Sequence, residues 1–109
     1  MSTIIKQSET FRRALKFNSL KTGAVIDLTG CEAYSQMRKH PKGELLGTAV
    51  CAIDITQGII TATWSKEQTA EFPVGQAGYD IWLVSGDEQK PIYTETVEII
   101  AGYTENMGE

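Results

Sequence analysis

The chain has few of the residue types on which most active sites depend. It contains one histidine, His40, and two cysteines, Cys31 and Cys51, which lie in separate segments without the spacing of a metal site or a redox motif. His40 stands in a turn surrounded by positive charge, and we interpret it as a solvent-exposed residue. A lone histidine without ligand-spaced partners predicts no metal site. In a chain without an export signal, the two cysteines are expected to be reduced, buried thiols.

Motifs for nucleotide, cofactor and calcium binding are missing as well. The ten glycines stand singly at turns, and none belongs to a dinucleotide, phosphate-loop, nucleophile-elbow or calcium-loop pattern. Two carboxylate pairs are conceivable, Asp54 with Glu67 and Asp80 with Glu95. A small β-domain with short turns offers little cleft in which two carboxylates could flank a substrate. The sequence therefore predicts no catalytic residue, no cofactor and no small-molecule substrate, and a protein that is not an enzyme.

Positive charge and long apolar runs are also scarce. Ten Lys and Arg against 14 Asp and Glu give a net charge of −4, which repels nucleic acid. No apolar run approaches the roughly 18 residues of a membrane helix, and Met1–Gln7 lacks the character of a signal peptide. We predict one domain over residues 1–109, made in the cytoplasm, without nucleic-acid or membrane partners. Residues 1–8 and 101–109 are expected to be flexible.

One short basic cluster departs from this balance. Residues 38–42 read Arg-Lys-His-Pro-Lys and so hold three of the ten Lys and Arg. Such a cluster could contact phosphates or an acidic partner. Because it is short and has no interleaved aromatic residues, the sequence favours a solubilising loop.

What the chain does have is period-two alternation of apolar and polar residues. Alternation with turn signals every 8–12 residues is typical of an antiparallel β-sandwich. We predict about seven strands, at residues 10–17, 25–28, 31–39, 45–55, 59–64, 79–84 and 92–100, with a possible break at Gly47. A short crossover helix is expected between Ser65 and Phe72, capped by Ser65 and Gln68 and stopped by Pro73.

The segment from Phe72 to Leu83 is the most informative local pattern. A turn rich in Pro and Gly leads into Tyr79 and then into an alternating strand. This layout resembles a tyrosine corner, in which the phenol packs inside a sandwich and its hydroxyl bonds to backbone a few residues upstream. We therefore predict an immunoglobulin-like β-sandwich with Tyr79 as its structural tyrosine.

The two tryptophans are expected on different faces. Trp64 shares a face with Ile60 and Ala62, which predicts a core position. Trp82 falls on the face opposite Tyr79 and should point outward, beside Tyr93 of the next strand. Exposed apolar patches on small proteins commonly mark interfaces, so Trp82 and Tyr93 form the candidate interface. Cross-strand packing or cover from a loop is an equally open interpretation.

Several segments in order resemble a known family. Residues 10–100 resemble small tail and baseplate-associated proteins of tailed bacteriophages and prophages, including the N-terminal immunoglobulin-like domain of upper baseplate proteins. The segments that carry the resemblance are Phe11–Phe17, Ile26–Gly30, Ala33–Arg38, Gly58–Thr61, Trp64–Ala70 and Gly78–Leu83. The chain departs from the upper baseplate pattern because it ends soon after the sandwich, without a long helical or fibre segment.

The resemblance implies a virion structural or adaptor module without catalytic activity. Such a module would be made in the host cytoplasm, join the virion, and act by assembly with other virion proteins or with itself as a homo-oligomer. The alternative that the residues leave open is a carbohydrate-binding or adhesion module. In that case the aromatic residues would stack on sugar rings and the acids would bond hydroxyls; the candidates are Trp82, Tyr93, Tyr103, Asp80 and Asp87.

Overall fold

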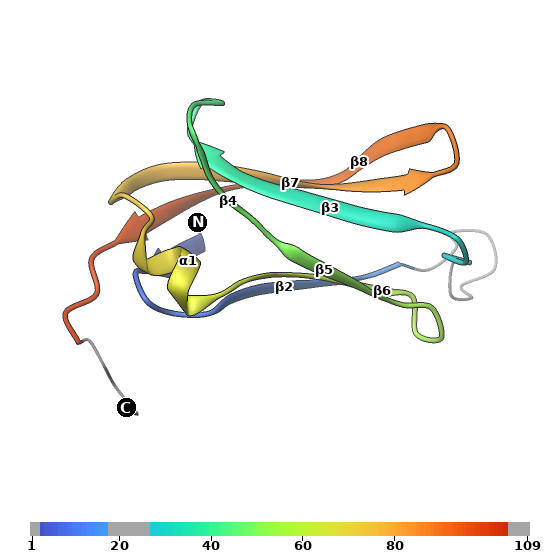
Figure 1. The fold of residues 1–109 in the computed structure, drawn as a ribbon, viewed down its shortest axis with the longest axis horizontal. Coiled ribbons are helices and arrows are strands. Elements are labelled where there is room, and N and C mark those ends of the chain that lie inside the picture. Colours follow the sequence, from blue (N-terminus) through green and yellow to red (C-terminus); the bar gives the residue numbers. More distant parts are fainter. Residues whose placement is uncertain (1–2, 18–26, 105–109) are drawn as a thin grey trace.

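Two β-sheets pack face to face in the computed structural model, which describes residues 3–17 and 27–104 (Figure 1). The larger sheet has five strands in the order β1-β8-β7-β3-β4, and the smaller has three in the order β2-β6-β5. The strands of the five-stranded sheet are β1 Thr3–Lys6, β3 Glu32–Lys39, β4 Leu45–Thr48, β7 Gly75–Ser85 and β8 Glu88–Ile100. Those of the three-stranded sheet are β2 Phe11–Lys16, β5 Val50–Asp54 and β6 Ile59–Trp64.

The expectation of an all-β sandwich is confirmed, with two differences in detail. Thr3–Lys6 forms β1, where the sequence predicted a flexible end, and it pairs in parallel with the end of β8. Ile5 of this strand is completely buried, so its contact with the core holds the segment in place. The strand expected at residues 25–28 lies largely outside the described residues, and Asp27 and Leu28 are not in a strand.

The segment expected as one strand at residues 45–55 is shared between the two sheets. β4 pairs with β3 and β5 pairs with β6, so the chain passes from one sheet to the other at Ala49. The break therefore comes two residues after Gly47. Gly47 does not mark the break. Its missing side chain lets the backbone pack closely against Phe72, because a Cβ there would stand 3.2 Å from the Phe72 ring. β5 and β6 pair as an antiparallel hairpin.

The one helix among the described residues, α1 (Lys66–Ala70), is as the sequence predicts. The Ser65 side chain accepts from the backbone N–H of Gln68, and the Gln68 side chain accepts from the backbone N–H of Ser65. This capping box satisfies two backbone donors that a helix start leaves free. The helix crosses from β6 to β7 and so links the sheets. Thr69, completely buried, anchors it by donating to the carbonyl of Glu9 at 2.7 Å.

Aromatic rings fill the centre of the space between the sheets. Trp64 is completely buried, as expected, and its ring centroid lies 5.1 Å from that of Tyr79 and 5.6 Å from that of Phe11. Tyr79 and Phe11 meet edge to face at 5.8 Å. Such geometry suits aromatic quadrupoles and adds to the hydrophobic gain of burial. Each ring comes from a different strand, so the cluster joins β2, β6 and β7.

A charged network closes one side of this core. Arg13 donates to the Tyr79 hydroxyl at 3.0 Å and forms an ion pair of 2.7 Å with Glu95. Tyr79 donates to the same Glu95 oxygen at 2.5 Å, and Thr3 donates to the other oxygen at 2.6 Å. Arg13 sits on β2, an edge strand of the three-stranded sheet. The network therefore ties the three-stranded sheet to β1, β7 and β8.

The network shifts the pKa values of its members. The hydrogen bond to Tyr79 is the largest cause that raises the pKa of Arg13. Burial, followed by the bond to Glu95, raises the pKa of Tyr79 well above its usual range. Burial alone would raise the pKa of Glu95, but the hydrogen bonds from Thr3, Tyr79 and Arg13 outweigh it and hold that pKa below its usual value. A charged Arg13, a charged Glu95 and a neutral Tyr79 are thus the stable set near neutral pH.

Tyr79 differs from the tyrosine-corner expectation. Its ring is buried between the sheets as predicted, with 3% of its surface exposed. Its hydroxyl bonds to the side chains of Glu95 and Arg13, not to backbone a few residues upstream. The reason is that β7 already begins at Gly75, so the residues before Tyr79 are paired with β8 and β3 instead of forming a corner.

Candidate interaction surface

The solvent side of the five-stranded sheet, which we call the outer face, carries the candidate interface residue Trp82. The register of β3, β7 and β8 places outward side chains in rows across these strands. Successive rows lie about 6.8 Å apart along the strands, because outward residues alternate with inward ones. In order, the rows are Arg38–Gly78–Thr96, Gln36–Asp80–Thr94, Tyr34–Trp82–Pro91 and Glu32–Val84–Gln89.

The third of these, which we call the aromatic row, contains the candidate interface residue Trp82. Trp82 is half-buried and lies directly opposite Tyr34, whose side chain is 52% exposed. The Tyr34 hydroxyl donates to the Glu32 carboxylate on the same strand, and this bond raises the pKa of Tyr34. The indole and the phenol thus form an apolar patch with polar atoms at its margin. Trp82 points outward, as the sequence predicts.

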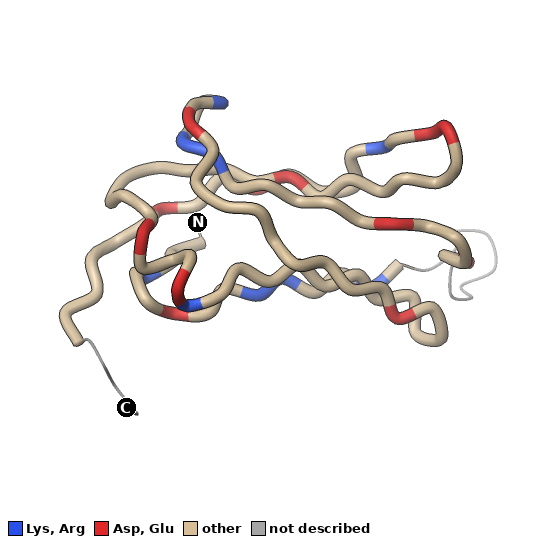
Figure 2. The backbone as a smooth tube through the Cα atoms, viewed as in Figure 1, with Lys and Arg blue, Asp and Glu red and all other residues tan. Residues whose placement is uncertain are grey.

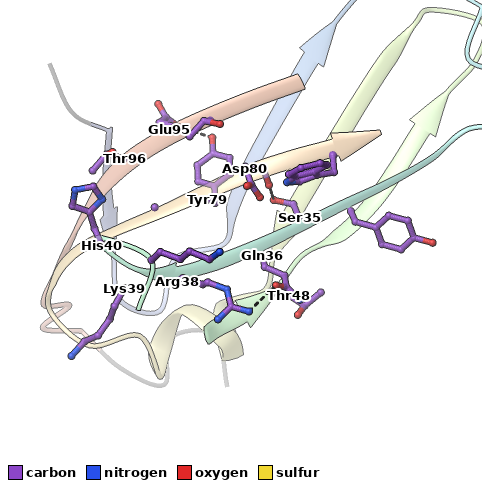
Figure 3. Close-up of a pocket in the computed structure, with 15 residues that line it drawn as sticks. Ser35, Gln36, Arg38, Lys39, His40, Thr48, Tyr79, Asp80, Glu95 and Thr96 are labelled. Atoms are coloured by element: carbon purple, nitrogen blue, oxygen red, sulfur yellow. Dashed lines mark hydrogen bonds between the residues drawn. The ribbon is translucent and has the colours of Figure 1, made fainter. Parts of the chain in front are cut away.

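A hollow of about 650 Å³ runs from the aromatic row toward the turn between β3 and β4 (Figure 3). It exists partly because Gly78 has no side chain in the middle of β7. A Cβ at Gly78 would meet the carbonyl of Glu95 at 3.6 Å and Nδ1 of His40 at 3.9 Å, which are ordinary contacts. The residues that line it include the polar Gln36 and Asp80 and the threonines of β8, although apolar atoms make up most of the lining surface.

One end of the outer face is basic. This basic end consists of Arg38, Lys39 and Lys42 at the β3–β4 turn, with one acid, Glu44, in the same turn (Figure 2). The Arg38 guanidinium donates to the Gln36 side chain at 3.2 Å and to the carbonyl of Gly43 at 3.3 Å. Within residues 3–17 and 27–104 the Arg13–Glu95 contact is the one ion pair, so these three cations face solvent without a carboxylate partner there.

The opposite end of the same face is acidic. The β7–β8 hairpin turns at Gly86, whose φ of 60° suits glycine, and presents Asp87 and Glu88 at its exposed tip. We call these two residues the acidic tip. By register Glu88 and Lys90 alternate with the outward Gln89, and both are exposed, so Lys90 lies close to the acidic tip. Apart from Asp80 in the second row and Glu98, an exposed outward acid of β8 next to the Arg38–Gly78–Thr96 row, the cations and acids of this face gather at opposite ends of the strands (Figure 2), and the aromatic row lies between the two ends.

The second candidate interface residue, Tyr93, lies on the wrong face for the predicted patch. Tyr93 pairs with Ile81, which is completely buried, and its ring centroid is 6.1 Å from that of Tyr79. The cause is a β-bulge in β8, where the register shifts between Ile81 and Trp82 and leaves Ile92 as the extra residue. A shift of one residue moves a side chain to the opposite face. Trp82 and Tyr93 therefore do not form one surface, and Tyr34 takes the expected place of Tyr93.

The residues of the carbohydrate alternative are also dispersed. Tyr93 packs between the sheets, and Tyr103, 90% exposed, lies beyond the end of β8. Asp80 is next to Trp82 on the outer face, while Asp87 is at the hairpin tip. The three aromatic residues do not make a continuous row for stacking sugars.

The remaining candidate residues give no reactive constellation in the described part of the chain. His40 is exposed in the β3–β4 turn, and both cysteines are free and half-buried. Burial raises the pKa of Cys51, which disfavours its thiolate. No group of three or more His, Cys, Asp and Glu gathers among residues 3–17 and 27–104 as a metal would need. In those residues, no helix has the length and apolar character to cross a bilayer.

Comparisons with known proteins add little to this geometry. No family model matches the chain, and no curated protein does. Among solved structures, the N-terminal domain of phage TP901-1 ORF48 is similar, with 13% sequence identity and a TM-score of 0.47. The alignment covers 94% of this chain and 86% of that one. At this level of similarity the likeness carries no argument about function.

Proposed function

We propose that the chain is a non-catalytic structural or adaptor module of a phage or prophage virion, in the tail or baseplate region, that acts through protein–protein contacts on its outer face. The observation that carries this proposal is the aromatic row, in which half-buried Trp82 is paired across the strands with exposed Tyr34 on the open side of the sheet. Trp and Tyr are the residues that most often dominate binding energy at protein interfaces.

The surroundings of the aromatic row support contact with a protein. The hollow beside it is open to solvent, and four strands and a turn line it. Amide, hydroxyl and charged side chains surround the apolar patch. Interfaces have this anatomy, an apolar centre within a polar margin. The resemblance of several ordered segments to phage tail and baseplate proteins suggests the setting in which such contacts would be made.

The test is whether the chain is built into particles. An antibody raised against the purified chain would be used to probe phage particles released from the source bacterium, by immunogold microscopy and by mass spectrometry of gradient-purified virions. We expect label at the tail end and a fixed copy number per particle. Recovery of the chain only in the fraction free of particles would contradict the proposal.

A pair of variants locates the contact surface. Trp82→Glu places a charge in the aromatic row and should abolish incorporation into particles, while the fold is retained because Trp82 faces outward. Val50→Glu is the matched control, since Val50 is 74% exposed on the three-stranded sheet, away from the outer face. Equal incorporation of both variants would show that the outer face is not the contact surface.

A further inference from the structure

The order of charges along the outer face makes that face complementary to itself. It runs from the basic end through a polar row to the aromatic row, and then to the acidic tip. If a second copy is turned by 180° about an axis that lies just outside the outer face, parallel to the sheet and along the aromatic row, its acidic tip lies over the first copy's basic end. Trp82 and Tyr34 of one copy then lie over the same residues of the other.

We infer that the outer face binds a second copy of this chain in a two-fold symmetric dimer. The inference rests on the proposed function, because it names the partner for the same face. A two-fold interface uses one patch on both copies, and each attractive contact occurs twice. The basic end of each copy would meet Asp87 and Glu88 of the other, and the two aromatic rows would share the centre.

The choice of a second copy as the occupant follows from charge and shape. Two copies at −4 repel each other overall, but the basic end of each attracts the acidic tip of the other, which favours this one orientation. The acidic tip stands at the end of the β7–β8 hairpin, at the opposite end of β7 from α1 (Figure 1), and the basic end borders the open hollow. A turn with two carboxylates fits a hollow edged by three cations. Two outer faces can stack as sheets do, about 10 Å apart.

The inference makes a charge-swap experiment decisive. Lys39→Glu with Lys42→Glu makes both ends of the face acidic, and Asp87→Lys with Glu88→Lys makes both ends basic. Each double variant alone should dimerise at least tenfold more weakly than the wild-type chain. Mixed one to one, the two variants should form a heterodimer within about threefold of wild-type affinity, because both of its end-to-end contacts are attractive again. Sedimentation velocity over a concentration series measures the dimer affinity of the wild-type chain, of each double variant and of their mixture.

The control variant changes net charge without touching the outer face. Arg12→Glu with Lys16→Glu alters charge by the same amount as the Lys39 and Lys42 pair, on exposed positions of β2 in the other sheet. It should dimerise like the wild type. Raising the salt concentration from 50 mM to 500 mM should weaken the wild-type dimer several-fold, since exposed charge pairs are screened.

The outcomes separate this inference from the proposed function. A wild-type chain that stays monomeric to about 1 mM at low salt, or a variant mixture that fails to restore the dimer, would overturn the dimer. Species that grow beyond a dimer would overturn the two-fold arrangement in favour of head-to-tail contacts. Either result leaves incorporation into particles as an independent measurement, which the Trp82→Glu and Val50→Glu pair decides for the proposed function.

Discussion

The two faces of the five-stranded sheet use aromatic residues and charges in opposite ways. On the inner face, Tyr79 packs against Trp64, and the nearby charges of Arg13 and Glu95 satisfy each other. On the outer face, Trp82 is half-buried, and the cations of the basic end have no carboxylate partner among the described residues. The strand β7 contributes to both faces, because its alternate residues point to opposite sides of the sheet. The comparison indicates that the inner residues specify the fold and the outer residues are free to serve a partner.

The largest effect should come from the inner tryptophan. Trp64→Ala removes a completely buried ring from the centre of the aromatic cluster and should lower the free energy of unfolding by about 4 kcal/mol. Urea denaturation followed by circular dichroism measures this loss. A loss below about 1 kcal/mol would mean that the cluster is not the centre of the core.

The second effect concerns the charged network between the sheets. Arg13→Ala leaves Glu95 and Tyr79 without their shared donor and should cost about 2 kcal/mol of stability. Glu95→Gln should cost less, because an amide oxygen still accepts from Arg13. In a double-mutant cycle the two losses should be clearly less than additive, since both variants break one network. Strict additivity would contradict the coupling.

A smaller effect should appear in the pH dependence of stability. The folded-state pKa of Glu95 is below its ordinary value of 4.5, so the folded chain binds this proton less readily than the unfolded chain. The contribution of Glu95 is therefore fully present above about pH 4.5 and is lost as the pH falls through the folded-state pKa. Urea titrations from pH 6 to pH 3 should show that the wild type loses more stability than Glu95→Gln. Parallel pH profiles would be the contrary result.

The smallest effect on stability should come from the outer tryptophan. Trp82→Ala removes a half-buried ring from the surface and should change the free energy of unfolding by less than about 1 kcal/mol, even though it removes as many atoms as Trp64→Ala. The urea midpoints of Trp64→Ala and Trp82→Ala, measured side by side, test whether the inner and outer faces differ in their contribution to stability. Similar losses at both positions would mean that Trp82 also supports the fold.

Local patterns in the sequence predicted much of this fold. Alternation placed Ile60, Ala62 and Trp64 inward, and the capping box fixed the start of α1, because both depend only on neighbouring residues. The pairing of β1 with β8 could not be found in this way, since its partners are more than ninety positions apart. The move of the chain between sheets at Ala49 likewise depends on how the two sheets pack.

In the candidate site, too, some features depend on neighbouring residues alone and others depend on how distant strands pair. That Trp82 points outward follows from alternation along β7, and Tyr34 belongs to the outward set of its own strand by the same rule. That the two face each other depends on the register between β3 and β7, which the sequence does not state. Tyr93 was placed wrongly because one extra residue, Ile92, reverses the alternation of β8 relative to its partner. A bulge of this kind has no clear sequence signal here.

The parallel pairing of β1 with β8 also has a mechanical consequence. The two strands run in the same direction, with Thr3 beside Val97 and Lys6 beside Ile100. Tension that draws Thr3 backward and Ile100 forward would act along the strands and shear them past each other. The hydrogen bonds between the strands would then bear the load together, instead of opening one after another like a zipper. The sandwich is thus built to resist stretching between these two points.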